Sequence, residues 1–309
     1  MNGKLAFCFP GQGSQDVGMG RAFAEAFPEA RAVFAEASEE VGYDVGRLCF
    51  EGPIEDLTRT EVQQPALVAT SVACLRAVET IGLKPDFVIG HSVGEYAALV
   101  AAGAISSREA VALVRERGAA MAEAADENPG AMAAVLGLPD ETVEALCADI
   151  GNVWPANYNC SGQIVVSGLN GAVDRLIELA TELGARRAVK LRVSGAFHSP
   201  LVARAAERLR PAVARVKFRE PAPPFMSTVT AKLEGAGRLA GLLVDQLTAP
   251  VRFTQAVGGL VKDGAGTFVE IGPGQVLGGI LRRCDRSLKT FSVGDPDGLR
   301  KLEETLSAA

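Results

Sequence analysis

The residues best suited to chemistry lie at Gly90–Gly94, which read GHSVG and match a G-x-S-x-G pattern. A short apolar run, Asp86–Gly90, leads into this pattern, and an alanine-rich stretch, Glu95–Ala102, follows it. Between a strand and a helix, such a pattern is typical of a nucleophile elbow, a sharp turn that exposes a serine hydroxyl. The sequence therefore predicts Ser92 as a nucleophile. The alternative is a tight glycine–serine turn that carries no chemistry.

A serine nucleophile needs a general base, which near neutral pH is usually a histidine. The chain has only two histidines. His91 directly precedes Ser92, so its side chain should point to the opposite face of the strand and pack against or support the elbow. Elimination leaves His198 as the general base. The alternative is that His198 is a capping or core histidine.

The group that orients the histidine is harder to find in the sequence. In an ordinary α/β-hydrolase an acid lies between the serine and a late histidine. Here the aspartates between Ser92 and His198 fall within a presumed insertion or at its edge: Asp126, Asp140, Asp149 and Asp174. A Ser–His dyad whose imidazole is held by a backbone carbonyl is therefore favoured over an aspartate triad.

Strands that alternate with helices must position these groups, and such alternation predicts a mostly parallel sheet covered on both faces. The strand candidates are Leu5–Phe9, Asp86–Gly90, Phe225–Val229 and Thr267–Ile271. The helix candidates are Arg21–Val41 with an interruption near Pro28, Pro65–Ile81, Glu95–Ala102, a helix from the N-cap Ser106 to Ala125, one from Ser199 and Pro200 to Arg215, Arg238–Leu247 and Phe253–Lys262.

The order of the strand and helix candidates changes between Asn128 and Ser194. The order strand, helix, strand, strand, helix, strand over this segment is that of a ferredoxin-like unit. Its elements are expected at Ala131–Leu136, Asp140–Ile150, Val153–Asn157, Gln163–Ser167, Ala172–Leu183 and Ala188–Val193, with Cys160–Gly162 in a turn. We therefore predict an α/β fold with an α/β-hydrolase-like body, residues 1–128 and 194–309, and an inserted ferredoxin-like (βαββαβ) subdomain, residues 129–193.

Composition narrows the classes of function. The net charge of -6 argues against a general nucleic-acid or membrane-surface binder. No apolar run reaches the roughly 18 residues of a membrane span, and the N-terminus does not resemble a signal peptide. The six cysteines form no C-x-x-C pair, which favours reduced thiols in the cytoplasm and no structural zinc site.

Six ordered motifs carry a family resemblance that extends over essentially the whole chain. They are PGQGSQ at Pro10–Gln15, GHSVGE at Gly90–Glu95, RERG around Arg117, ANYN at Ala156–Asn159, GAFHSP at Gly195–Pro200 and EIGPG at Glu270–Gly274. In this order they resemble the malonyl-CoA:acyl carrier protein transacylases, acyltransferases of fatty acid and polyketide synthesis.

The resemblance implies roles for single residues. Ser92 would be the acylated nucleophile, and His198 its base and acid. Arg117 would hold the malonyl carboxylate, a role that suits the planar guanidinium fork. Without the resemblance, Arg117 would be interpreted as a solvated charge on a helix.

Supporting groups are implied in the same way. The backbone N–H groups of Gln12 and Val93 would form the oxyanion hole. The backbone carbonyl of Gln246 would orient the histidine, although the LTAP that follows differs from the usual form. The implied pocket residues are His91, Phe197 and Asn157, with Phe197 limiting the room at the acyl α-carbon and favouring malonyl over methylmalonyl.

The implied activity is transfer of the malonyl group from malonyl-CoA to the phosphopantetheine thiol of acyl carrier protein. The protein is expected to act in the cytoplasm as a monomer, without a metal or a bound cofactor. The alternatives are a trans-acting polyketide-synthase acyltransferase, an acyl-thioester hydrolase and a non-catalytic carrier-docking module. Two basic clusters could meet an acidic carrier or simply be solvated surface: Arg186, Arg187, Lys190 and Arg192, and Arg282, Arg283 and Arg286.

Overall fold

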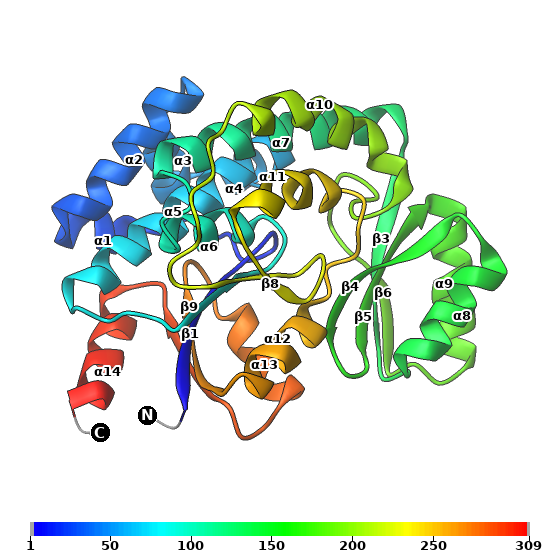
Figure 1. The fold of residues 1–309 in the computed structure, drawn as a ribbon. Coiled ribbons are helices and arrows are strands. Elements are labelled where there is room, and N and C mark those ends of the chain that lie inside the picture. The colour runs from blue at the N-terminus through cyan, green and yellow to red at the C-terminus, as the bar shows by residue number, and fades with distance from the viewer. Residues whose placement is uncertain (1–2, 308–309) are drawn as a thin grey trace.

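The computed structural model describes residues 3–307, and an α/β body lies beside a smaller unit of strands and helices (Figure 1). The body contains a six-stranded sheet in the order β10-β9-β1-β2-β7-β8. Only the β7–β8 pair of this sheet is antiparallel, which confirms the predicted mostly parallel sheet. The strands are β1 (Lys4–Phe9), β2 (Phe87–Gly90), β7 (Phe225–Ser227), β8 (Lys232–Glu234), β9 (Ala265–Ile271) and β10 (Lys289–Val293).

Strand β1 is buried on both faces. Because side chains alternate along a strand, Phe7 and Phe9 enter one hydrophobic core, whereas Ala6 and Cys8 enter another. Helices α12 (Phe253–Lys262) and α13 (Val276–Cys284) supply the second core. This two-sided cover explains why the strand is a continuous apolar run rather than an alternating one.

The remaining helices of the body contribute to the first core. They are α1 (Arg21–Ala26), α2 (Pro28–Val41), α3 (Val45–Glu51), α4 (Ile54–Leu57), α5 (Thr60–Thr80), α6 (Gly94–Ala101), α7 (Ser107–Glu127), α10 (Ala203–Ala214), α11 (Ala236–Asp245) and α14 (Pro296–Ser307). Helix α7 begins as predicted, with Ser106 as N-cap in a capping box with Glu109. Among residues 3–307, no helix has both the length and the apolar character needed to cross a membrane.

The smaller unit is a four-stranded antiparallel sheet in the order β4-β5-β3-β6. With two helices and its own hydrophobic core, it has the order and pairing of a ferredoxin-like unit, as predicted. Its elements are β3 (Gly130–Leu136), α8 (Asp140–Ile150), β4 (Val153–Cys160), β5 (Gln163–Leu169), α9 (Asn170–Glu182) and β6 (Arg187–Lys190).

A short backbone connection joins this unit to the body. Val251 donates its N–H to the carbonyl of Ala156 and accepts from the N–H of Tyr158, each at 2.8 Å. Asn157 therefore lies in a parallel bridge with Val251. This bridge pairs the middle of β4 with Val251, which follows α11 in the chain.

Several predicted boundaries were wrong. Helix α5 begins at Thr60 rather than at Pro65, so the proline lies inside the helix although helix interiors usually exclude it. Cys160 belongs to strand β4 instead of the turn. The helix expected from Pro200 starts as a 3₁₀ turn, Pro200–Val202, before α10. The short edge strand β8 and the half-buried β10 were not predicted.

Candidate active site

Ser92 lies in a sharp turn between β2 and α6. Its φ of 51° is left-handed, a conformation that non-glycine residues rarely adopt. A Cβ added at Gly90 would lie 2.1 Å from the carbonyl carbon of Gly94, and one at Gly94 would lie 2.2 Å from the carbonyl oxygen of Phe9. Both glycines are therefore required for the close passage of strand and helix, as in a nucleophile elbow.

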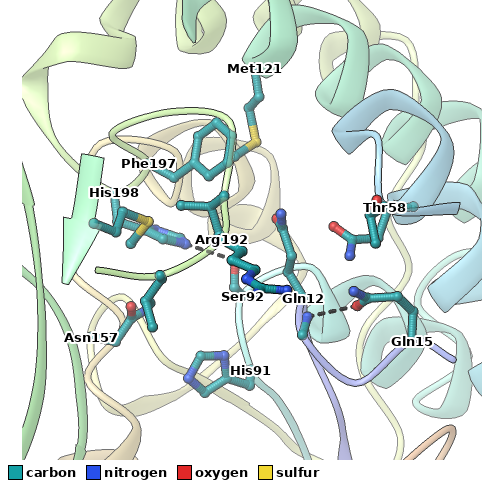
Figure 2. A pocket seen from close by; sticks show the side chains of 15 residues that line it. Gln12, Gln15, Thr58, His91, Ser92, Met121, Asn157, Arg192, Phe197 and His198 are labelled. Atoms are coloured by element: carbon teal, nitrogen blue, oxygen red, sulfur yellow. Dashed lines mark hydrogen bonds between the residues drawn. The ribbon is translucent and has the colours of Figure 1, made fainter. Parts of the chain in front are cut away.

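His198 lies beside the serine. Its Nε2 is 2.8 Å from Ser92 Oγ, and the two side chains face each other in Figure 2. The other ring nitrogen, Nδ1, lies 2.9 Å from the carbonyl oxygen of Gln246 and 3.1 Å from that of Ala249. Because carbonyl oxygens only accept hydrogen bonds, Nδ1 carries the proton and Nε2 presents a lone pair to the serine hydroxyl. The pair has the geometry of a dyad held by backbone carbonyls.

The environment of His198 keeps the imidazole neutral. Burial, followed by the positive charge of Arg117, lowers the pKa of His198 to about 3. At pH 7 the ring is therefore unprotonated and can accept the proton of Ser92. The histidine itself has a left-handed φ of 57°, a strained conformation that the sequence did not indicate.

Arg117 comes from the middle of α7 and is only 1% exposed, so it is not a solvated charge. Its Nη1 donates to Gln64 Oε1 at 2.7 Å. Its Nη2 donates to Ser92 Oγ at 3.1 Å and to Gln246 Oε1 at 3.0 Å. The guanidinium thus lies directly behind the serine, with neutral hydrogen-bond partners.

Two backbone amides can face an oxyanion near Ser92. Gln12 lies in the loop after β1, and a Cβ at Gly11 would lie 2.4 Å from the carbonyl oxygen of His91, so this loop passes very close to the elbow. Val93 follows the serine at the start of α6. Within residues 3–307, the backbone N–H groups of Gln12 and Val93 donate to no loop carbonyl and to no side chain. Both remain available for a developing negative charge.

A cavity of about 400 Å³ opens over the dyad (Figure 2). The predicted pocket residues His91, Asn157 and Phe197 all line its wall. His91 Nε2 also lies 2.9 Å from Asn159 Oδ1, and its ring packs against Phe253, so it supports the elbow as well. Further lining residues to which the sequence assigned no role are Gly13, Gln15, Thr58, Gln63, Met121, Met132, Leu191 and Val193.

The two basic clusters differ in their position relative to the cavity. Arg192 is exposed and lines the cavity. Lys190, two positions earlier, pairs with Asp174 at 2.7 Å. In the second cluster, Arg282 donates to Thr290 Oγ1 at 2.8 Å. Only the first of these clusters therefore contributes a cation to the cavity described above.

Three polar side chains that surround Arg117 and the dyad were missed in the sequence: Gln64, Glu95 and Thr228. Gln64 is completely buried within α5, and two adjacent glutamines in a largely apolar helix were the signal that could have indicated it. Glu95 closes the GHSVGE motif and is also completely buried. Buried polar groups need partners, so both positions imply a hydrogen-bond network around the site.

The site combines an elbow serine, a histidine held by backbone carbonyls and a buried arginine on an α/β-hydrolase-like body, an arrangement typical of enzymes with a serine nucleophile. Residues 6–295 match the family described as Acyl transferase domain. The chain belongs to this acyl transferase family, which confirms the resemblance found in the sequence.

Curated relatives extend over nearly the whole chain. The malonyl CoA-acyl carrier protein transacylase of Bacillus subtilis is 44% identical over 308 residues, which cover 98% of this chain and 97% of the relative. The protein of the same name from Escherichia coli K12 is 40% identical over 301 residues, which cover 96% of this chain and 97% of the relative.

Solved structures agree with this assignment. The malonyl CoA-acyl carrier protein transacylase of Coxiella burnetii matches with a TM-score of 0.96 and 37% identity, over 99% of this chain and 98% of that one. A structure described as a type II PKS acyl-carrier protein in complex with its malonyl-transacylase matches with a TM-score of 0.94 and 40% identity, over 98% of this chain and 99% of that one.

Proposed function

We propose that this protein transfers the malonyl group from malonyl-CoA to the phosphopantetheine thiol of an acyl carrier protein. The observation that carries the proposal is the position of Arg117, whose Nη2 lies 3.1 Å from Ser92 Oγ. Buried charges in proteins are normally paired. Within residues 3–307, Arg117 forms no direct salt bridge, because the buried carboxylate of Glu95 reaches it only through the Gln246 side chain. An acyl group that brings its own carboxylate would supply a direct ionic partner.

The first half-reaction forms an acyl-enzyme. His198 Nε2 takes the proton of Ser92 as the hydroxyl oxygen attacks the thioester carbonyl. The amides of Gln12 and Val93 stabilise the tetrahedral oxyanion. CoA leaves as the thiol, having received the proton from His198. The product is a malonyl-serine ester whose carboxylate is bound by Arg117.

The second half-reaction reverses these steps with a different thiol. The phosphopantetheine thiol of the carrier gives its proton to His198 and attacks the ester carbonyl. Collapse of the intermediate releases malonyl-carrier and returns the proton to Ser92. Ping-pong kinetics follow from the covalent intermediate. The proposed protein is a cytoplasmic monomer that uses malonyl-CoA as substrate and needs no metal or bound cofactor.

The alternatives differ from this proposal in acceptor or in pathway. A hydrolase would use the same dyad but pass the acyl group to water, and a simple esterase has no need of a buried guanidinium beside its serine. A carrier-docking module without activity would not require the short Ser92–His198 hydrogen bond. A polyketide pathway stays open, because one relative is described with a PKS carrier, whereas fatty acid synthesis is the pathway we propose.

Single-turnover transfer distinguishes the transferase from the hydrolase. Protein acylated with labelled malonyl-CoA and freed of CoA is mixed with carrier protein that does or does not bear phosphopantetheine. We expect the label to move to the phosphopantetheine-bearing carrier much faster than it is lost to water. Loss of label at the same rate with both carriers would refute the transfer function and favour the hydrolase.

A further inference from the structure

A buried carboxylate that the mechanism does not use lies behind the site. Glu95 is 0% exposed and follows the elbow in the first turn of α6. One of its oxygens, Oε1, accepts from the backbone N–H of Thr228 at 2.5 Å and from its hydroxyl at 2.7 Å. The other, Oε2, accepts from Gln246 Nε2 at 2.5 Å. The carboxylate therefore joins β7 and the loop after it to the end of α11.

Gln246 links the carboxylate to the catalytic groups. Its backbone carbonyl accepts from His198 Nδ1, and its side-chain Oε1 accepts from Arg117 Nη2. Its Nε2 donates to the backbone carbonyl of Ser92 at 3.1 Å as well as to Glu95. Every polar atom of this side chain is thus in use, and its contacts reach the nucleophile, the base and the arginine.

The Glu95 carboxylate, the Ser92 carbonyl and the Arg117 guanidinium all require the same orientation of the Gln246 amide. An ionised carboxylate can only accept, so it requires the NH₂ end of the Gln246 amide to face Glu95. The amide oxygen must then face Arg117, which can only donate. A flipped Gln246 amide would place a donor against the guanidinium of Arg117 and an acceptor against the carbonyl of Ser92.

We propose that Glu95 is a positioning residue that fixes the orientation of the Gln246 amide and, through it, the guanidinium of Arg117. This inference rests on the proposed function, because it assigns Glu95 to the selection of acyl groups that carry a carboxylate. Thr228, in turn, holds the carboxylate in place with two donors. Glu95 itself lies outside the cavity and touches no reacting atom.

Glu95→Gln tests the inference with almost no change in volume. The introduced amide has one donor end and one acceptor end, so its single oxygen cannot accept from both Thr228 and Gln246. Either two donor groups then face each other, or the Gln246 amide flips. Since hydrogen bonds to charged groups are individually strong, we expect the ratio of kcat/KM for malonyl-CoA to that for acetyl-CoA to fall about tenfold or more. The assay is run at pH 8, because burial raises the pKa of Glu95 to about 7.

Two further variants separate positioning from general stability. Glu270→Gln alters another buried carboxylate, which accepts from the N–H groups of Leu277 and Gly278 in α13. It should lower the melting temperature without changing the malonyl-to-acetyl ratio. Thr228→Val removes one donor to Glu95 and should lower the malonyl-to-acetyl ratio of kcat/KM by a smaller factor than Glu95→Gln. This variant provides the test if Glu95→Gln folds poorly.

The outcomes are distinct. An active wild type whose ratio is unchanged in both Glu95→Gln and Thr228→Val overturns the inference and leaves the proposed function intact. Equal losses with both substrates assign Glu95 a structural role and also overturn the inference. A wild type that does not react with malonyl-CoA overturns the proposed function and the inference with it.

Discussion

Replacing Arg117 with alanine should remove the preference for an acyl group that carries a carboxylate. The side chain is buried, and its two terminal nitrogens face Ser92, Gln64 and Gln246. A malonyl carboxylate on this fork forms a buried ion pair, and truncation of one partner of such a pair costs about 2–5 kcal/mol. That range corresponds to a loss of roughly 30-fold to several thousandfold in kcat/KM for malonyl-CoA.

Steady-state kinetics with malonyl-CoA and acetyl-CoA measure this loss. Acetyl-CoA brings no carboxylate, so its kcat/KM should fall much less or rise. Arg115→Ala is a matched control, because Arg115 lies on the same helix, is 40% exposed and pairs with Glu40 and Glu116. It should leave both substrates nearly unchanged. Equal losses on malonyl-CoA and acetyl-CoA in Arg117→Ala would refute the carboxylate-binding role.

Three other predictions concern the pocket, the elbow and the base. Phe197→Ala should raise kcat/KM for methylmalonyl-CoA relative to malonyl-CoA several-fold, because it opens the cavity wall beside the dyad; an unchanged ratio would contradict this. Gly94→Ala should destabilise the fold by about 1–3 kcal/mol in denaturant unfolding, whereas Gly171→Ala, with open space around its Cβ, should not. Since the pKa of His198 falls from 6.5 to about 3 on folding, only the unfolded chain takes up this proton as the pH falls below 6.5, and the free energy of unfolding decreases. His198→Gln lacks this histidine, so its free energy of unfolding should gain about 2 kcal/mol relative to wild type between pH 7 and 5. Parallel plots of unfolding free energy against pH for the two proteins would contradict the low pKa.

The dyad could be predicted from the sequence because its signals are local or exclusive. The glycines around Ser92 mark the elbow in consecutive residues, and a chain with two histidines leaves His198 as the only base of suitable position. Because the aspartates between Ser92 and His198 lie in the inserted unit or at its edge, the sequence favoured a backbone carbonyl as the orienting group. The carbonyl oxygens of Gln246 and Ala249 lie at Nδ1 of the histidine.

The hydrogen-bond network behind the site could not be predicted in the same way. Gln64, Glu95 and Gln246 come from α5, α6 and the end of α11, and no local pattern shows that these segments converge on Arg117. Burial of Arg117 also depends on how α7 packs. The edge strand β8 was missed for a simpler reason, because its residues are mostly exposed and lack an apolar pattern.

The most direct measurement of the proposed chemistry is the mass of the Ser92 peptide after brief exposure of the protein to malonyl-CoA. The proposed acyl-enzyme predicts an increase of about 86 Da, the mass of a malonyl group that replaces a proton, on this peptide alone. Ser92→Ala should show no increase. An unmodified Ser92 peptide in the wild type, or an equal adduct in Ser92→Ala, would contradict a malonyl-serine intermediate.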